Sequence, residues 1–88
     1  MDWEHAESEL LELAERLEVE VRRVRYAGAG GMCVIKGKRV LMVNERLDAP
    51  DRVAVIARAL GQLREVENVF VVPELRALIE KFSGERDG

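Results

Sequence analysis

The sequence predicts an α+β fold, in which three helices pack against a small antiparallel sheet of three to four strands. Two stretches, 2–18 and 53–63, repeat apolar residues at intervals of three and four, which is the period of an amphipathic helix. Between them lie short runs rich in β-branched residues, separated by glycines, as is typical of strands and their turns. A third apolar stripe at helical spacing follows Pro73, and proline is favoured at the first position of a helix.

The first helix is predicted over residues 2–18. Asp2 is suited to cap its amino end, because a carboxylate there accepts a backbone hydrogen bond and faces the positive end of the helix dipole. The apolar seam of this helix consists of Trp3, Ala6, Leu10, Leu13 and Leu17. A seam of about two heptads is short for a coiled coil, so we expect it to form one wall of a globular core.

Three strands are predicted at 19–26, 32–35 and 40–43. Gly37 lies in the turn between the last two, where a tight hairpin requires a positive φ. The third strand is apolar on both faces, which indicates a central strand or a sheet that is covered on both sides. A later run, 69–72, is either a short fourth strand or an extended packing segment.

The second and third helices have clear ends. Asp48 is the predicted N-cap of the second helix, and Gly61 near its other end costs about 1 kcal/mol relative to alanine, which indicates a close approach by a neighbouring backbone. The third helix runs from its proline to Gly84, a residue that commonly ends helices. We therefore expect one domain over 1–84, followed by a frayed tail at 85–88.

Composition limits the environment of the chain. Its 88 residues make one domain, and a chain of this size buries only about 60–65% of the surface that it exposes when unfolded, which favours pairing with a second copy. Cys33 is the single cysteine, so no internal disulfide can form, and we expect a reducing, cytoplasmic location. We expect neither a signal peptide nor a membrane span, since no apolar run approaches about 18 residues. The lack of threonine and the few amide side chains suit a thermophile or a GC-rich genome.

Charge is segregated along the chain. The net charge is −7 over residues 1–20, +6 over 21–46 and −2 over 47–88. The basic residues of the middle segment are candidates for contact with RNA or DNA: Arg22, Arg23, Arg25, Lys36, Lys38 and Arg39. However, the pI is about 5.2 and only Tyr26 is available to stack on a base, so we do not expect a nucleic-acid partner. The other interpretation is that these cations pair with the acidic first helix, in the same chain or in a partner.

After the predicted sheet, Val43-Asn44 leads into a capped helix that contains Arg58-Ala59-Leu60-Gly61-Gln62. This order of elements resembles the amino-terminal part of the zincin-like metallopeptidases of the ImmA/IrrE type, over roughly residues 10–63. The resemblance implies a three-stranded sheet that leads into a helix with an H-E-x-x-H motif, in which Leu60-Gly61 would occupy the middle positions.

The departures from that motif exclude its chemistry. Zinc needs two imidazoles four residues apart, and the bound water needs a carboxylate as general base. Arg58 would repel the cation, Ala59 cannot take a proton, and Gln62 is a poor ligand. Glu74 or Glu80 is a candidate for the family's later ligand, but one carboxylate cannot hold zinc by itself. The resemblance therefore implies a non-catalytic relative without metal or cofactor, in which Arg58 and Gln62 face a bound peptide.

Two other features have a functional and a structural interpretation. The run Gly28-Ala29-Gly30-Gly31 begins like a phosphate-binding loop, but a strand follows it where a pyrophosphate site requires a helix. It is then simply a connection between strands. Cys33 is either a nucleophile or a thiol packed within a strand, and a nucleophile would need a base that the sequence does not place beside it.

These patterns together predict a non-enzymatic domain that acts through protein–protein contacts and forms a homodimer. The candidate dimer contact is the apolar face of the last helix, formed by Leu75, Leu78, Ile79 and Phe82. The seam of the first helix is the alternative contact. A second hypothesis is a metallopeptidase-like regulator that grips a peptide without cutting it, which requires an open cleft beside Arg58 and Gln62. A third is a small enzyme that uses the glycine loop and Cys33.

Overall fold

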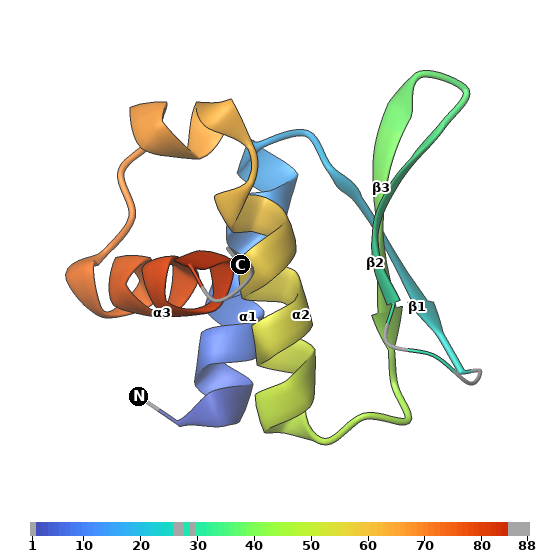
Figure 1. The fold of residues 1–88 in the computed structure, drawn as a ribbon, viewed down its shortest axis with the longest axis horizontal. Coiled ribbons are helices and arrows are strands. Elements are labelled where there is room, and N and C mark those ends of the chain that lie inside the picture. The colour runs from blue at the N-terminus through green and yellow to red at the C-terminus, as the bar shows by residue number, and fades with distance from the viewer. Residues whose placement is uncertain (1, 26–27, 29, 85–88) are drawn as a thin grey trace.

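A computed structural model describes residues 2–25, 28 and 30–84 (Figure 1). The elements follow in the order α1 (Trp3–Arg16), β1 (Glu20–Val24), β2 (Gly30–Ile35), β3 (Lys38–Asn44), α2 (Ala49–Gly61), a 3-10 helix η1 (Arg64–Asn68) and α3 (Pro73–Gly84). The predicted α+β class is confirmed, since the helices pack on one three-stranded sheet. The predicted tail at 85–88 lies outside the described residues.

The sheet has the strand order β1-β3-β2 and is mixed rather than wholly antiparallel. β2 and β3 form an antiparallel hairpin, whereas β1 runs parallel to β3. β3 lies between β1 and β2, the two strands that precede it in the chain. The chain reverses direction between β1 and β2 and again between β2 and β3, so β3 has the same direction as β1. The central position predicted for the apolar strand is confirmed, because β3 pairs with β1 on one side and with β2 on the other.

The α1 and α2 helices cover one face of the sheet (Figure 1). Asp2 caps α1 as predicted, since its carboxylate accepts a hydrogen bond from the His5 amide at 2.7 Å. Asp48 occupies the N-cap position of α2 but makes no side-chain hydrogen bond there, so the predicted capping contact is absent. The segment 69–72 is not a strand, although Val69 has an extended backbone, and Val71 within the segment is buried.

The core lies between the sheet and the two helices, with α3 packed against the far side of α2. It includes the predicted seam residues Ala6, Leu10, Leu13 and Leu17 of the first helical segment, together with Val53, Ile56 and Leu60 of α2. Trp3, by contrast, is 41% exposed. Burial of these aliphatic side chains is the main force that fixes the helices on the sheet.

Gly61 permits the close packing of α2 and α3. A Cβ atom at this position would lie 2.7 Å from the Cβ atom of Ser83 and 3.0 Å from a methyl carbon of Ile79. The close approach that the sequence predicted is therefore present, but the neighbouring atoms are side chains of α3 rather than backbone. The conformational cost of glycine in the helix is offset by this contact.

Candidate functional site

The two edges of the sheet differ in their side chains. Three of the five residues in β1 carry a charge, whereas none of the six residues in β2 does. Charged side chains normally prevent an edge strand from pairing with another chain. β2 therefore presents the less protected edge, and Val34 within it is 66% exposed.

The turn that follows β2 fixes which of its backbone groups point outward. Lys36 has φ 53° and Gly37 has φ 80°, so the two residues form a turn in which both central φ angles are positive. In such a hairpin the flanking pair, Ile35 and Lys38, exchanges hydrogen bonds, and pairs alternate from there along the ladder. The N–H and C=O groups of Met32 and Val34 consequently point away from β3, toward the open edge.

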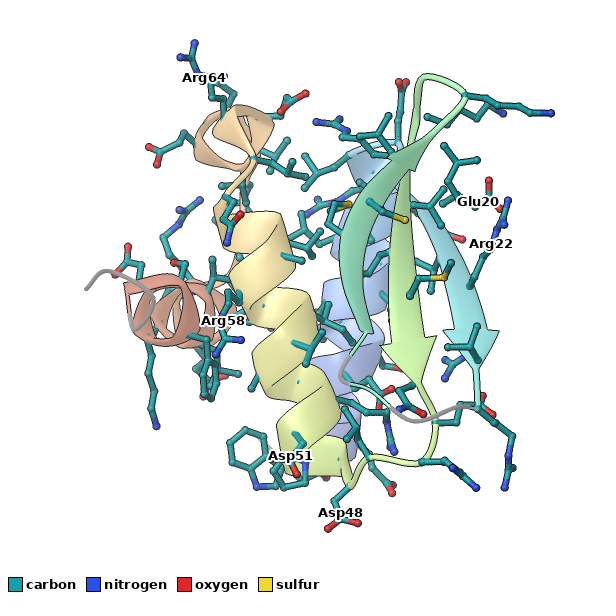
Figure 2. The ribbon with its side chains drawn as sticks, turned by 45° about the vertical axis from the view of Figure 1, so that its right-hand side comes forward. Glu20, Arg22, Asp48, Asp51, Arg58 and Arg64 are labelled. Carbon is teal, nitrogen blue, oxygen red and sulfur yellow. The ribbon has the colours of Figure 1, made fainter. Side chains whose placement is uncertain are left out.

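A groove runs between this edge and α2. Its lining residues are Gly30, Gly31, Met32, Val55, Arg58, Ala59 and Gln62. The four α2 residues are spaced by three and four, which places them on one face of the helix. The structure thus brings Arg58 and Gln62 to one groove beside a strand edge. Figure 2 shows the Arg58 side chain on the flank of α2 near α3. This groove lies where the peptide-binding hypothesis places its cleft.

Glycine at the start of β2 allows two close approaches of backbone. A Cβ atom on Gly30 would lie 2.4 Å from the carbonyl oxygen of Met42, so only glycine fits there without a shift of β2 or β3. Gly31 has φ +132° and open space where a Cβ atom would lie. An incoming chain can therefore approach the backbone of Gly31 closely, because no side chain stands in the way.

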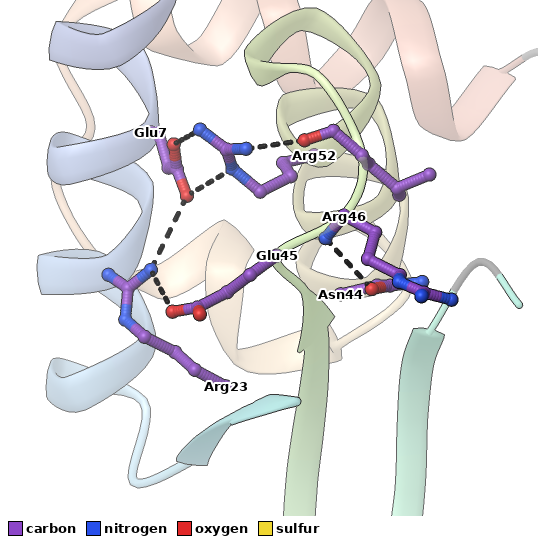
Figure 3. Close-up of polar contacts among 7 residues, drawn as sticks. Glu7, Arg23, Asn44, Glu45, Arg46 and Arg52 are labelled. Atoms are coloured by element: carbon purple, nitrogen blue, oxygen red, sulfur yellow. Dashed lines mark hydrogen bonds and ion pairs between the residues drawn. The ribbon is translucent and has the colours of Figure 1, made fainter. Parts of the chain in front are cut away.

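A polar cluster holds α2 to α1 at the opposite end of the helix from Gly61 (Figure 3). The Glu7 carboxylate is buried and accepts hydrogen bonds from Arg52 at 2.9 and 3.0 Å, and it lies 3.8 Å from Arg23. Arg52 also donates to the Leu47 carbonyl. The hydrogen bond that Arg52 donates to the Glu7 carboxylate raises the pKa of Arg52, so its guanidinium group stays charged. The cluster orients α2, and hence the groove, but its members point away from the β2 edge.

The basic residues of the sheet are largely committed to contacts within the chain. Arg22 pairs with Glu20 at 2.7 Å, and Arg39 pairs with Glu65 at 3.0 Å and donates to the carbonyl of Leu17. Arg23 lies 3.8 Å from the carboxylates of Glu7 and Glu45. The predicted pairing with the acidic first helix thus holds for Arg23, through Glu7. The exposed Lys36 lies in the turn after β2, and the exposed Lys38 follows that turn.

The residues predicted as a dimer contact are divided between core and surface. Leu75 and Ile79 are each 3% exposed and belong to the core, whereas Leu78 and Phe82 are half-buried against it. The face of α3 is therefore used mainly inside the chain. Cys33 is half-buried in β2, and the structure describes only Gly28, Gly30 and Gly31 of the glycine loop.

One exposed aromatic residue was not singled out from the sequence. Phe70 is 73% exposed beside a second groove between α1 and the segment that leads to α3. Arg16 donates a hydrogen bond to its carbonyl at 3.0 Å, and Glu9 and Glu12 line the same groove. Its position in the apolar run 69–72 gave no sign of exposure, because that run contains three valines as well.

Within the described residues, no group of three or more His, Cys, Asp or Glu side chains could hold a metal ion. None of the helices described is both long and apolar enough to cross a bilayer. No family model matches the chain, and comparisons with curated proteins and with solved structures return no match.

Proposed function

We propose that this protein is a non-enzymatic interaction domain that binds an extended segment of a partner protein along the β2 edge, as an added strand of the sheet. The observation that carries the proposal is the edge itself, which has no charged side chain over Gly30–Ile35 and lies beside a groove. Main-chain hydrogen bonds provide affinity in this mode of recognition, and side-chain pockets provide specificity.

The backbone geometry supports strand addition. The outward N–H and C=O groups of Met32 and Val34 offer two pairs of hydrogen bonds, spaced as an added strand requires. Every second side chain of the added strand would point to the groove, where Val55 and Gln62 lie on the exposed side of α2. An alternation of apolar and polar residues in the bound segment fits this arrangement.

The charges around the groove favour an acidic segment. Arg58 lines the groove, and no acidic residue is among its described lining residues. Lys36 lies in the turn at one end of β2, and Lys38 follows that turn. Complementary charge guides encounter and selects among partners, so an acidic segment is favoured over a basic one.

The resemblance to ImmA/IrrE-type metallopeptidases points to the same groove. A non-catalytic relative that grips a peptide would use the face on which Arg58 and Gln62 lie, since these positions replace the family's two histidines. The two hypotheses thus describe one site, and both involve a protein partner. The single cysteine supports a cytoplasmic location for this domain.

The proposal is tested with a synthetic peptide of about eight residues, the length of an ordinary strand, that alternates valine with glutamate. Fluorescence polarisation measures its affinity, and a lysine counterpart of the same length serves as the comparison. We expect the glutamate peptide to bind more tightly by about tenfold or more. An NMR titration with the glutamate peptide locates the site through changes in the backbone amide chemical shifts. Equal affinity for both peptides, or shift changes in β1 rather than β2, would contradict the proposal.

A proline at position 34 isolates the contribution of the backbone. Val34→Pro removes one outward N–H group and no ladder bond to β3, so the fold tolerates it as edge strands tolerate proline. We expect it to weaken binding of the glutamate peptide by about tenfold. Val34→Thr is the matched control, because it changes the side chain but keeps the N–H group, and its affinity should stay within about threefold of wild type.

A further inference from the structure

The face of the sheet that turns away from the helices has a surface of its own. Leu41 and Val43 belong to the core cluster, whereas Val40 is only 1% exposed but lies outside that cluster. Because side chains alternate along a strand, Val40 and Met42 point to the other face. Figure 2 shows Glu20 and Arg22 on this same side, away from the helices.

On this outer face, half-buried apolar residues surround Val40, which its neighbours already cover, and charged residues lie along the β1 border and at Lys38. The strand register places Val40 between Glu20 and Cys33 in one row, and Met42 between Arg22 and Gly31 in the next row on the same side. Ile35 and Val24, both half-buried, extend the apolar part, and the exposed Lys38 lies beside Ile35 on the same side. None of the helices in the described part of the chain packs on this face (Figure 1).

We propose that a second copy of this chain covers the outer face, so that two sheets pack face to face about a two-fold axis. This proposal is independent of peptide binding, because the β2 edge and its groove lie at the side of the sheet. It replaces α3 as the expected dimer contact, since Leu75 and Ile79 are occupied inside the chain.

The proposal rests on the self-complementarity of the two rows. If the axis runs across the strands between the rows, each row of one subunit faces the other row of its partner. Glu20 then lies opposite Arg22 of the partner subunit and Cys33 opposite the partner's Gly31, while the half-buried Met42 lies over the partner's Val40, which its own neighbours cover. An acid meets a base, and the thiol meets the residue that has no side chain. A two-fold axis places each of these contacts twice in the interface.

The size of the face sets the strength of the dimer. Three strands about 4.8 Å apart and about six residues long cover on the order of 300 Å² in projection. This is less than the roughly 800 Å² per partner of a standard interface, so the dimer is weak and depends on concentration. Association is therefore measured by sedimentation equilibrium from about 10 µM to about 1 mM, a range suited to a small interface. We expect the mean mass to rise toward twice the 10.0 kDa of one chain.

Charge exchange distinguishes the intermolecular contact from the ion pair within one chain. Glu20→Arg places two cations opposite each other across the axis, and Arg22→Glu places two anions there. Each variant should therefore weaken self-association by about tenfold or more. In an equimolar mixture of the two variants, every contact of the mixed pair joins an acid and a base. The mixture should then associate at least as tightly as wild type.

Two matched variants control for net charge. Glu12→Arg on α1 and Arg64→Glu on η1 make the same charge changes away from the outer face, and they should leave the association unchanged. Circular dichroism checks that each variant folds. A wild-type protein that remains at 10.0 kDa over the whole range overturns the proposal. So does a mixture of Glu20→Arg and Arg22→Glu that is no heavier than its components.

Discussion

β1 and β2 flank the same central strand, and each has a helix beside it, yet they present different edges. β1 carries Glu20, Arg22 and Arg23 along its five residues, whereas β2 runs for six residues without a charge. The groove beside β1 is lined by Glu15 and Arg23, whereas Arg58 is the single charged residue among the described residues that line the groove beside β2. The difference shows that one edge is protected from further pairing and the other is left open to it.

The two edges also differ in what secures them. β1 carries ion pairs, since Arg23 reaches Glu7 on α1 and Arg22 pairs with Glu20 within the strand itself. β2 is held by its hairpin ladder with β3, by the fit of Gly30 under Met42 and by the apolar contact with α2. Disturbing packing should therefore affect the β2 edge most, and disturbing charge should affect the β1 edge.

Removal of core volume from α2 should have the largest effect. Leu60 is fully buried, so Leu60→Ala should lower the free energy of unfolding by about 2–5 kcal/mol through lost burial and a cavity. Val55→Ala on the same helix is the control, because Val55 is half-buried at the groove and should cost less than about 1 kcal/mol. Urea denaturation measures both. A loss below about 0.5 kcal/mol for Leu60→Ala would show that this face of α2 does not support the sheet.

A smaller loss is expected where β2 begins. Gly30→Ala should destabilise the fold by about 2–3 kcal/mol, because its Cβ atom would meet the Met42 carbonyl and the residue has φ +88°. Gly31→Ala shares the positive φ but has open space, so it should cost only about 1 kcal/mol. Chemical denaturation of both variants compares the contact with the backbone strain. Equal losses would show that contact with β3 does not secure this end of the edge.

The smallest effect concerns charge at β1. The hydrogen bond from Arg22 lowers the pKa of Glu20 below its ordinary value of 4.5, so the folded state is favoured while this carboxylate is ionised. That contribution is present above the unfolded pKa and is lost as the pH falls through the lower folded value. The melting temperature should therefore fall slightly more between about pH 5 and about pH 3 in wild type than in Glu20→Gln.

Glu65 makes a second contribution to stability that is lost as the pH falls. A hydrogen bond from its own backbone N–H, and then one from Arg39, lowers the pKa of this carboxyl group. When Glu65→Gln is added to Glu20→Gln, the melting temperature should therefore fall less between about pH 5 and about pH 3 than it does in Glu20→Gln by itself. Dilute samples keep the proposed dimer out of these measurements. An identical dependence on pH in wild type and in both variants would show that neither ion pair contributes to stability.

The periodicity of the sequence was sufficient to locate the helices and the hairpin. The seam of α1 and the stripe of α2 are local patterns, since residues three and four apart share a helix face whatever the rest of the chain does. Gly37 similarly marked the turn, because the positive φ is a property of that position. The apolar character of 40–43 indicated either a central strand or a sheet covered on both sides, and the strand order shows the central position.

Long-range packing decided the rest. Neither the parallel pairing of β1 with β3 nor the position of Arg58 and Gln62 beside an open edge is encoded in a local period. The apolar face of α3 has the same pattern whether it packs inside the chain or against a second copy, and only the placement of α2 shows that Leu75 and Ile79 are buried. Residue spacing determines which side chains share a face. What that face meets depends on contacts between segments far apart in the chain, and only the folded structure brings those segments together.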